Sequence, residues 1–200
     1  MEDNAADRFY CRYIKRAFDL LFSALLLFFL SLPMLFIALA VRIDSKGEAI
    51  FKQVRCGREG REFICYKFRT MYSDAPHDRP AARFENAEYY VTRVGRLLRR
   101  SSLDELPQLF NVLKGDMSIV GPRPLIKEEQ GMHEGRMISG VYKIRPGITG
   151  LAQISGRKLL CDEEKLMADQ CYLSKMGALV DMGIVLQTLK KVMTREGVGE

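Results

Sequence analysis

The chain has 200 residues, of which 48% are hydrophobic and 28% charged, a composition that fits one folded domain and excludes a disordered or fibrous protein. Its formal charge of +6 favours anionic lipid headgroups and phosphate-bearing ligands, whereas nucleic acid is disfavoured because the sequence has no helix-turn-helix, zinc-finger or RNP-like pattern. Five widely spaced cysteines without a C-x-x-C pair, and only two histidines, argue against a zinc site, a disulfide framework and a Ser-His-Asp triad.

The first predicted element is a membrane segment over Leu20–Val41, a run of 22 residues without a charge. As a helix with a rise of about 1.5 Å per residue it reaches about 33 Å, enough for a hydrocarbon core of about 30 Å. Pro33 removes a backbone donor and frees the carbonyl of Phe29, and Ser31 is placed to bond a freed backbone group. We therefore expect a kink at Ser31 and Pro33.

Basic residues flank this apolar run on both sides. Because basic flanks belong on the cytoplasmic side, a re-entrant helix-break-helix fits both flanks, whereas a single crossing fits only one. A cleaved signal peptide is a further alternative, since residues 38–40 resemble an A-x-A site, but the run exceeds the usual apolar core of about 7–15 residues. The sequence therefore predicts a re-entrant membrane anchor over residues 1–45 and a cytoplasmic domain over 46–200 that forms one structural unit with it.

A β-hairpin is predicted after the anchor. Residues 49–54 and 62–68 are rich in β-branched and aromatic side chains, and the glycines between them permit a turn. Residues 73–83 are expected to form a mobile loop, and residues 85–100 a helical segment. That segment carries a cationic stripe, a pattern that usually marks a solvated face, formed by Arg93, Arg96, Arg99 and Arg100.

Two adjacent acids, Asp104 and Glu105, follow the stripe. Ser102 and Glu105 fit the S-x-x-E capping box, which places both acids at the start of a helix over residues 106–113 that Gly115 closes. Adjacent helical residues diverge by about 100°, so the two carboxylates could divide nucleophilic attack from metal or proton duties. The simpler alternative is that they only cap the helix and complement its dipole.

Two amphipathic helices are predicted near the C-terminus, over residues 162–175 and 179–195. The apolar stripe of the second helix is of a kind that usually packs in a core, and contact with the membrane surface is the alternative. Together with the hairpin and the anchor, these segments predict an α+β fold that is predominantly α-helical.

The stretch from Ser102 to Pro124, SLDELPQLFNVLKGDMSIVGPRP, resembles the core signature of the monotopic phosphoglycosyl transferases, a family of bacterial sugar transferases. The resemblance covers roughly residues 14–192, the family's minimal catalytic domain, and departs from the family at the break, Ser31-Leu-Pro33, and at the link 174–178. Further matching segments lie at Lys67–Met71 (KFRTM), Arg93–Arg96 (RVGR) and Arg145–Gln153 (RPGITGLAQ).

This resemblance implies transfer of a sugar 1-phosphate from a UDP-sugar to a polyprenyl phosphate such as undecaprenyl phosphate, giving polyprenyl-diphosphate-sugar and UMP. It implies Asp104 as the nucleophile, Glu105 as its dyad partner, and Mg²⁺ as a cofactor with Asp104 as its protein ligand. It also implies a monotopic protein of the bacterial inner membrane, in contact with membrane lipids, whose active site lies on the cytoplasmic face. The basic residues expected to bind phosphate or nucleotide are Lys67, Arg99, Arg123 and Arg145.

Two other functions stay open at the level of sequence: a membrane-bound scaffold that binds anionic lipid, and a transferase that works by a single direct displacement. The sequence also leaves open the identity of the sugar, the glycan assembled downstream, the polyprenyl length and any homo-oligomer.

Overall fold

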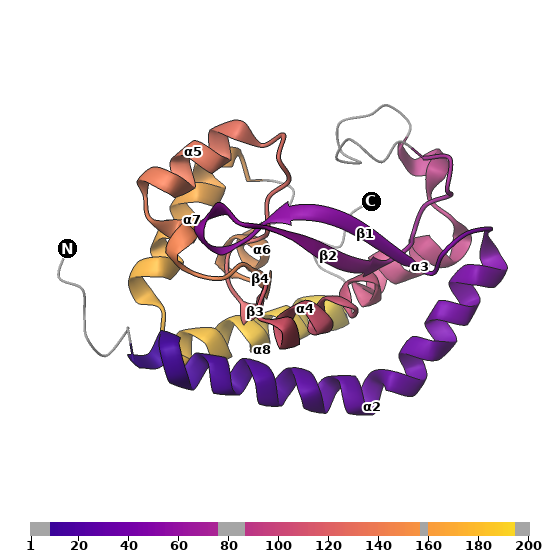
Figure 1. Cartoon of the computed structure of the whole chain (residues 1–200), viewed down its shortest axis with the longest axis horizontal. Coiled ribbons are helices and arrows are strands. Elements are labelled where there is room, and N and C mark those ends of the chain that lie inside the picture. The colour runs from indigo at the N-terminus through magenta and orange to yellow at the C-terminus, as the bar shows by residue number, and fades with distance from the viewer. Residues whose placement is uncertain (1–8, 76–86, 157–159, 195–200) are drawn as a thin grey trace.

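The computed structural model describes residues 9–75, 87–156 and 160–194. Figure 1 shows a long N-terminal helix along one edge of the molecule, a β-hairpin that crosses above it, and shorter helices grouped at both ends of the hairpin. The predicted α+β, mostly helical fold is confirmed.

Helix α2, Lys15–Asp44, is the predicted membrane segment, and a π-helical turn, Tyr10–Ile14, precedes it. It continues through Pro33 without a break and bends along its length (Figure 1). Ser31 Oγ donates to the carbonyl of Phe28 at 2.8 Å rather than to that of Phe29, because a serine hydroxyl on a helix reaches back three or four residues and not two. The expected kink is therefore a bend in a continuous helix.

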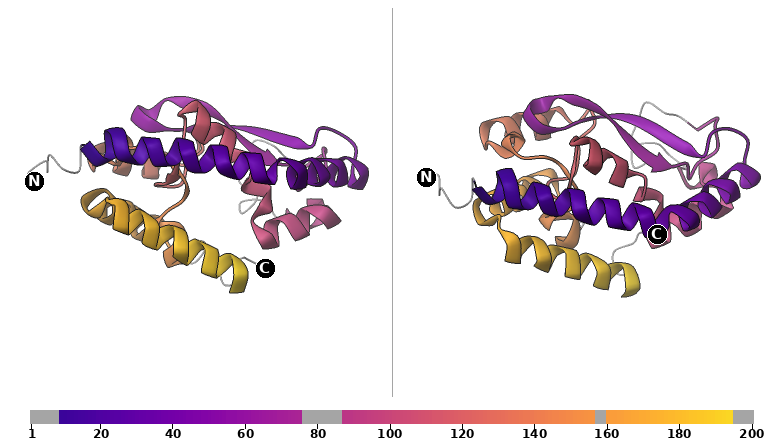
Figure 2. Two further views of the ribbon diagram at one scale, coloured as in Figure 1. Left: turned by 90° about the horizontal axis from the view of Figure 1, so that it is seen from below. Right: turned by 60° about the horizontal axis from the view of Figure 1, so that its bottom comes forward.

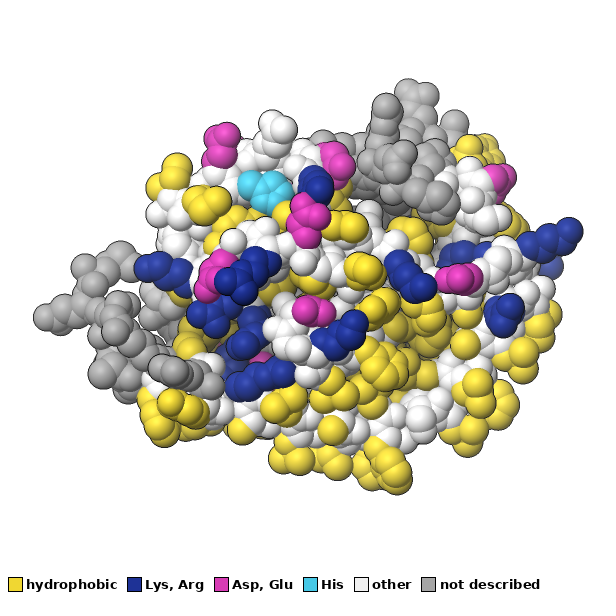
Figure 3. All heavy atoms as spheres, in the orientation of Figure 1, with side chains coloured by type: hydrophobic (Ala, Val, Ile, Leu, Met, Phe, Trp, Pro, Cys, Tyr) yellow, Lys and Arg dark blue, Asp and Glu magenta, His cyan; other side chains and the backbone are white. Residues whose placement is uncertain are grey.

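The outer face of α2 is strongly apolar. Phe28, Phe29, Leu35 and Phe36 are each between 62% and 74% exposed. Figure 3 shows hydrophobic side chains gathered along the lower edge of the molecule, where α2 runs. Among the described residues, α2 is the one helix long and apolar enough to cross a membrane by length and composition.

Both ends of α2 dock on the remainder of the chain. At its start, Lys15 pairs with the carboxylate of Asp181, and both side chains are about 90% buried. At its end, Asp44 Oδ2 accepts the backbone N–H of Val94 at 3.0 Å. Between these points Leu26, Leu27 and Leu30 pack against the hydrophobic core, so the helix is packed against the rest of the molecule along its length rather than joined to it by a linker.

The hairpin consists of β1, Ile50–Cys56, and β2, Glu62–Phe68, which pair antiparallel with Phe51 opposite Lys67. A short 3₁₀ turn, Arg58–Gly60, joins them. This confirms the predicted hairpin, with β1 extended to Cys56. Cys65 and Lys67 lie two residues apart on β2, so both side chains project from the same face.

The chain between the hairpin and the acids forms a 3₁₀ helix, Ala87–Tyr90, and helix α3, Arg93–Ser101. Thr92 caps α3 by accepting the N–H of Gly95 at 2.9 Å, so the helix starts later than predicted. The loop predicted over 73–83 lies largely outside the described residues.

The predicted capping box at the acids is wrong. Ser102 adopts the left-handed conformation, φ 55°, and makes no side-chain cap, while the Glu105 side chain turns away to Lys67. A 3₁₀ turn, η5, holds Leu103–Glu105, and helix α4, Gln108–Lys114, begins only after Pro107. Gly115 closes α4 with a positive φ of 96°, as predicted.

A second, parallel pair of short strands was not predicted: β3, Ser118–Val120, and β4, Gly147–Thr149. The pairing needs glycine, because a Cβ on Gly147 would lie 2.1 Å from the backbone nitrogen of Gly121. Since both strands run in the same direction, the segments that follow them, 121–124 and 150–153, leave from the same edge.

The remaining helices complete the core. Helices α7, Asp162–Lys175, and α8, Ala178–Thr194, match the predicted pair closely, whereas α5, Gln130–Ile138, the 3₁₀ turn Val141–Lys143, and α6, Leu151–Ser155, were not predicted. Ile184 of α8 is buried, yet Leu179 and Met193 on the same helix are more than 80% exposed. Figure 2, in which the underside of the molecule is turned into view, shows α8 running alongside α2.

Candidate active site

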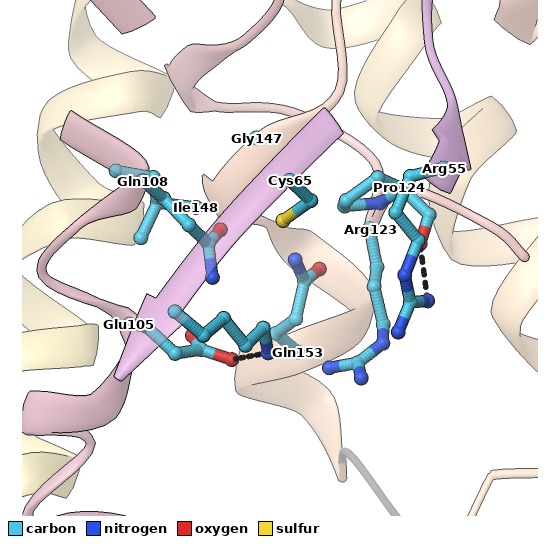
Figure 4. Close-up of a pocket in the computed structure, with 10 residues that line it drawn as sticks. Arg55, Cys65, Glu105, Gln108, Arg123, Pro124, Gly147, Ile148 and Gln153 are labelled. Carbon is cyan, nitrogen blue, oxygen red and sulfur yellow. Dashed lines mark hydrogen bonds and ion pairs between the residues drawn. The ribbon is translucent and has the colours of Figure 1, made fainter. Parts of the chain in front are cut away.

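A small cavity lies beneath the hairpin, at the start of α4. We call it the Glu105 cavity; its volume of about 10 Å³ matches the space that one water needs. Strand β2, the turn η5, and the segments after β3 and β4 supply most of its walls, and Figure 4 shows their side chains converging on it. It is lined by Arg55, Cys65, Lys67, Glu105, Gln108, Arg123, Pro124, Gly147, Ile148 and Gln153.

The two acids occupy different sides of η5. Glu105 Oε1 accepts from Lys67 Nζ at 2.8 Å, and the two side chains are only 13% and 20% exposed. Successive residues of a 3₁₀ turn diverge by about 120°, so Asp104 points elsewhere. Asp104 does not line the Glu105 cavity and instead lies within electrostatic reach of Arg99. The two carboxylates therefore lie in different surroundings, and the division of chemical roles between them stays a prediction.

Arg99 approaches the acids from α3. Its Nε donates to Thr70 Oγ1 at 2.9 Å, which orients the guanidinium. Burial lowers the pKa of Arg99, and the nearby carboxylate of Asp104 opposes that shift. A partly buried cation that is kept beside Asp104 suits a site that receives a further anion.

Arg123 enters the Glu105 cavity from the segment after β3, and its backbone is held in two places. Arg136 donates to the carbonyl of Arg123 at 2.8 Å, and Arg55 donates to that of Pro124 at 3.0 Å. Arg136 is itself fixed by a fully buried ion pair with Asp169, 2.6 Å long and 4% and 2% exposed. The Arg123 side chain is exposed and projects from this rigid backbone.

Arg145 does not join these residues. It lines a separate cavity of about 410 Å³ beside the hairpin turn, and its Nε donates to the carbonyl of Gly115 at the far end of α4. Burial and the neighbouring Arg16 and Arg58 lower the pKa of Arg145. The contact to phosphate or nucleotide expected for Arg145 therefore stays a prediction.

Three polar residues of the Glu105 cavity were not predicted from the sequence: Arg55, Gln108 and Gln153. Arg55 lies in the segment predicted from the sequence to be a turn. The two glutamines lie inside the stretches that match the family, but they carry no charge that would single them out as site residues. Burial lowers the pKa of Arg55, and the adjacent Arg123 lowers it further. Two guanidinium groups with one carboxylate, Glu105, among the lining residues indicate an anion-binding site.

The described carboxylates could hold a metal ion only together with ligands from a substrate. Within residues 9–75, 87–156 and 160–194, no three Asp, Glu, His or Cys side chains come together to hold a metal ion. Mg²⁺ commonly takes one or two carboxylates and completes its shell with substrate phosphates and water, which fits Asp104. Glu105 is the poorer ligand because Lys67 engages it.

Carboxylates beside an excess of cations, in a chain with a helix of membrane length, are the combination expected of an enzyme that handles phosphorylated substrates at a membrane surface. The family model of the bacterial sugar transferases matches residues 10–195. The chain belongs to this family, so the resemblance inferred from the sequence is confirmed, and with it the expectation of a sugar-phosphate transferase.

Named relatives agree with this assignment. The chain is 40% identical to the uncharacterized sugar transferase EpsL of Bacillus subtilis, covering 92% of this chain and 90% of that protein. It is 40% identical to the UDP-glucose:undecaprenyl-phosphate glucose-1-phosphate transferase of Caulobacter vibrioides, covering 91% of this chain and 70% of that protein. The undecaprenyl-phosphate galactose phosphotransferase of Salmonella typhimurium is 37% identical over 98% of this chain, which spans only 44% of that relative.

Proposed function

We propose that the protein transfers a sugar 1-phosphate from a UDP-sugar to a polyprenyl phosphate, undecaprenyl phosphate in the named relatives, and releases UMP. The observation that carries the proposal is the Glu105 cavity, where Arg55, Lys67 and Arg123 face one carboxylate, with Asp104 and Arg99 at its side. This excess of positive charge suits a diphosphate, and relatives named for glucose and galactose phosphate transfer supply the substrate class.

In this proposal the reaction proceeds in two displacements. A carboxylate oxygen of Asp104 attacks the sugar-linked phosphorus, and the bond to UMP breaks, with UMP leaving as the dianion. A phosphate oxygen of the polyprenyl phosphate then attacks the same phosphorus, forms the diphosphate and releases the carboxylate. Glu105, held by Lys67, serves as the partner of Asp104, and the guanidinium groups of Arg99 and Arg123 stabilise the developing charge.

Mg²⁺ is proposed as the cofactor, with Asp104 as its protein ligand. When bound, it would screen the repulsion between the attacking carboxylate and the diphosphate. Lys67, Arg99 and Arg123 would share that task from fixed positions.

The geometry of α2 supports the proposed re-entrant anchor. Its start is bound through Lys15 to Asp181, and its end through Asp44 to Val94, so both ends contact the same body of the protein. A helix that crossed the bilayer once would place its ends on opposite sides and could not keep both contacts. We therefore propose a monotopic protein of the bacterial inner membrane, with residues 46–200 on the cytoplasmic side and the bend at Ser31 and Pro33 inside the bilayer.

The variant Asp104→Asn tests the function. With polyprenyl phosphate and a panel of UDP-sugars, the unaltered protein should release UMP from at least one donor, and the variant should fall to the background rate. Binding to anionic vesicles should be the same for both proteins. A variant with undiminished UMP release would overturn the assignment of Asp104, and a native protein without UMP release from any donor would favour a lipid-binding scaffold.

A further inference from the structure

Gln153 of α6 places its amide inside the Glu105 cavity. Figure 4 shows this amide standing between Gln108 and Arg123, above the ion pair of Glu105. Its Oε1 is shielded from solvent and has no hydrogen-bond partner in the part of the chain that the structure describes. Buried polar atoms are nearly always paired, because a buried acceptor without a donor is costly. An acceptor left open inside a substrate cavity therefore points to a donor that the ligand supplies.

The backbone around Gln153 keeps this position available. A Cβ on Gly150 would lie 2.7 Å from Oε1 of Gln153 and 2.1 Å from the carbonyl oxygen of Gly121, so only glycine fits there. Gly121 follows β3 and Gly150 follows β4, so the parallel strand pair fixes both segments. The same pair therefore places Arg123 and Gln153 on the walls of one cavity.

The lining of the cavity determines which group of a UDP-sugar can bind next to Gln153. Phosphate oxygens only accept hydrogen bonds, so they belong with the guanidinium and ammonium groups and would be repelled by an amide oxygen. A free volume of about 10 Å³ has room for one water-sized group and none for a uracil ring, so the diphosphate would lie at the mouth of the cavity, where the Arg123 side chain is exposed. A hydroxyl group has the right size and carries the donor that Oε1 lacks.

We propose that Gln153 is a donor-binding residue whose amide oxygen accepts a hydrogen bond from a hydroxyl group of the UDP-sugar. This inference rests on the proposed function, because it takes the UDP-sugar as the substrate. The hydroxyl can come from the transferred sugar or from the ribose, and the experiment below separates the two sources.

The test compares Gln153→Met with the matched control Gln170→Met, which changes an exposed glutamine on α7. Steady-state rates of UMP release are measured against the UDP-sugar and against polyprenyl phosphate, together with competitive inhibition by UMP and the thermal midpoint. Loss of one neutral hydrogen bond should lower kcat/KM for the donor by roughly 3- to 10-fold in Gln153→Met and leave kcat/KM for the lipid acceptor unchanged. The thermal midpoint should stay level or rise, because methionine removes the unpaired acceptor, and the control should match the unaltered protein.

Each outcome bears on the inference. UMP inhibition that weakens by the same factor assigns the hydroxyl to the ribose, and unchanged UMP inhibition assigns it to the transferred sugar; both support the proposal. Unchanged donor kinetics would overturn it and leave the amide to a bound water, and so would an equal loss for donor and acceptor. If the unaltered protein released no UMP from any UDP-sugar, the proposed function itself would fail. This result comes from the unaltered protein, so it is distinguishable from a failure of the Gln153 proposal.

Discussion

Lys67 is the residue on which the placement of Glu105 depends. Its ammonium lies 2.8 Å from the carboxylate, and both side chains are largely buried. Lys67→Met would leave that carboxylate without its cation, and a hydrogen bond to a charged group contributes about 1.5–3 kcal/mol. We expect kcat/KM for the donor to fall by roughly 10- to 100-fold, measured by UMP release.

A lysine on the other strand of the hairpin supplies the control for this prediction. Lys52 is exposed and lies 3.7 Å from Glu48, an interaction of the weak surface kind. Lys52→Met should leave the rate unchanged. A Lys67→Met protein that is folded and as active as the unaltered one would show that Glu105 needs no cation.

The reactivity of Cys65 reports how far this side chain, on the wall of the Glu105 cavity, is shielded from solvent. The thiol is 2% exposed, and burial raises its pKa, against the opposing effect of Lys67. A raised pKa means less thiolate at every pH below it, and the thiolate is the form that reacts. Alkylation of Cys65, followed by mass spectrometry from pH 7 to 10, should begin only above the pH at which an ordinary thiol of pKa about 8.5 reacts. Reaction at pH 7 as fast as that of a small free thiol would contradict the burial of Cys65.

At the scale of elements, the ion pair between α5 and α7 holds the backbone of Arg123 in place. Asp169 holds Arg136, and Arg136 holds the carbonyl of Arg123. Asp169→Asn would leave a buried guanidinium without a countercharge, which costs about 3–5 kcal/mol of the free energy of unfolding. Urea unfolding of the detergent-solubilised protein measures this loss.

Asp162→Asn is the matched change, because Asp162 pairs with Lys165 at 2.8 Å on an exposed part of the same helix. It should cost under about 1 kcal/mol. Equal stabilities for the two variants would show that the buried pair does not hold α5 against α7.

Sequence patterns predicted the elements that depend on local signals. The hairpin, α7 and the close of α4 at Gly115 follow from β-branched runs, helical periodicity and a glycine with positive φ. The identity of the dyad and of Lys67, Arg99 and Arg123 as site candidates came from the matched motifs, and the structure brings these five residues to the two sides of η5.

Non-local pairing explains what the sequence did not show. Strands β3 and β4 have three residues each, too few for a readable alternation, and they pair across 29 residues. Ser102 has the residue type of a helix cap but takes a left-handed conformation, since the chain must turn between α3 and η5. The position of Gln153 in the cavity and the pairing of Arg136 with Asp169 arise only when the chain is folded.

At the scale of the whole molecule, the two docked ends of α2 predict a same-sided topology. Tyr13→Cys and Lys46→Cys place thiols at exposed positions just before and just after the helix, in a background whose accessible native cysteines are replaced by serine. An impermeant maleimide should label both in inside-out vesicles and neither in right-side-out vesicles. Labelling of the two thiols from opposite sides would show a single crossing and would contradict the docking of both ends.

To detect a phosphosugar carried by Asp104, a UDP-sugar labelled in its sugar is added to the membrane-embedded protein without any lipid acceptor. We expect UMP to appear in an amount equal to that of active protein, and mass spectrometry to find the labelled sugar phosphate on Asp104. Subsequent polyprenyl phosphate should remove the label. UMP release that begins only when the lipid is present, with no label on the protein at any time, would contradict a covalent intermediate on Asp104 and establish a single direct displacement.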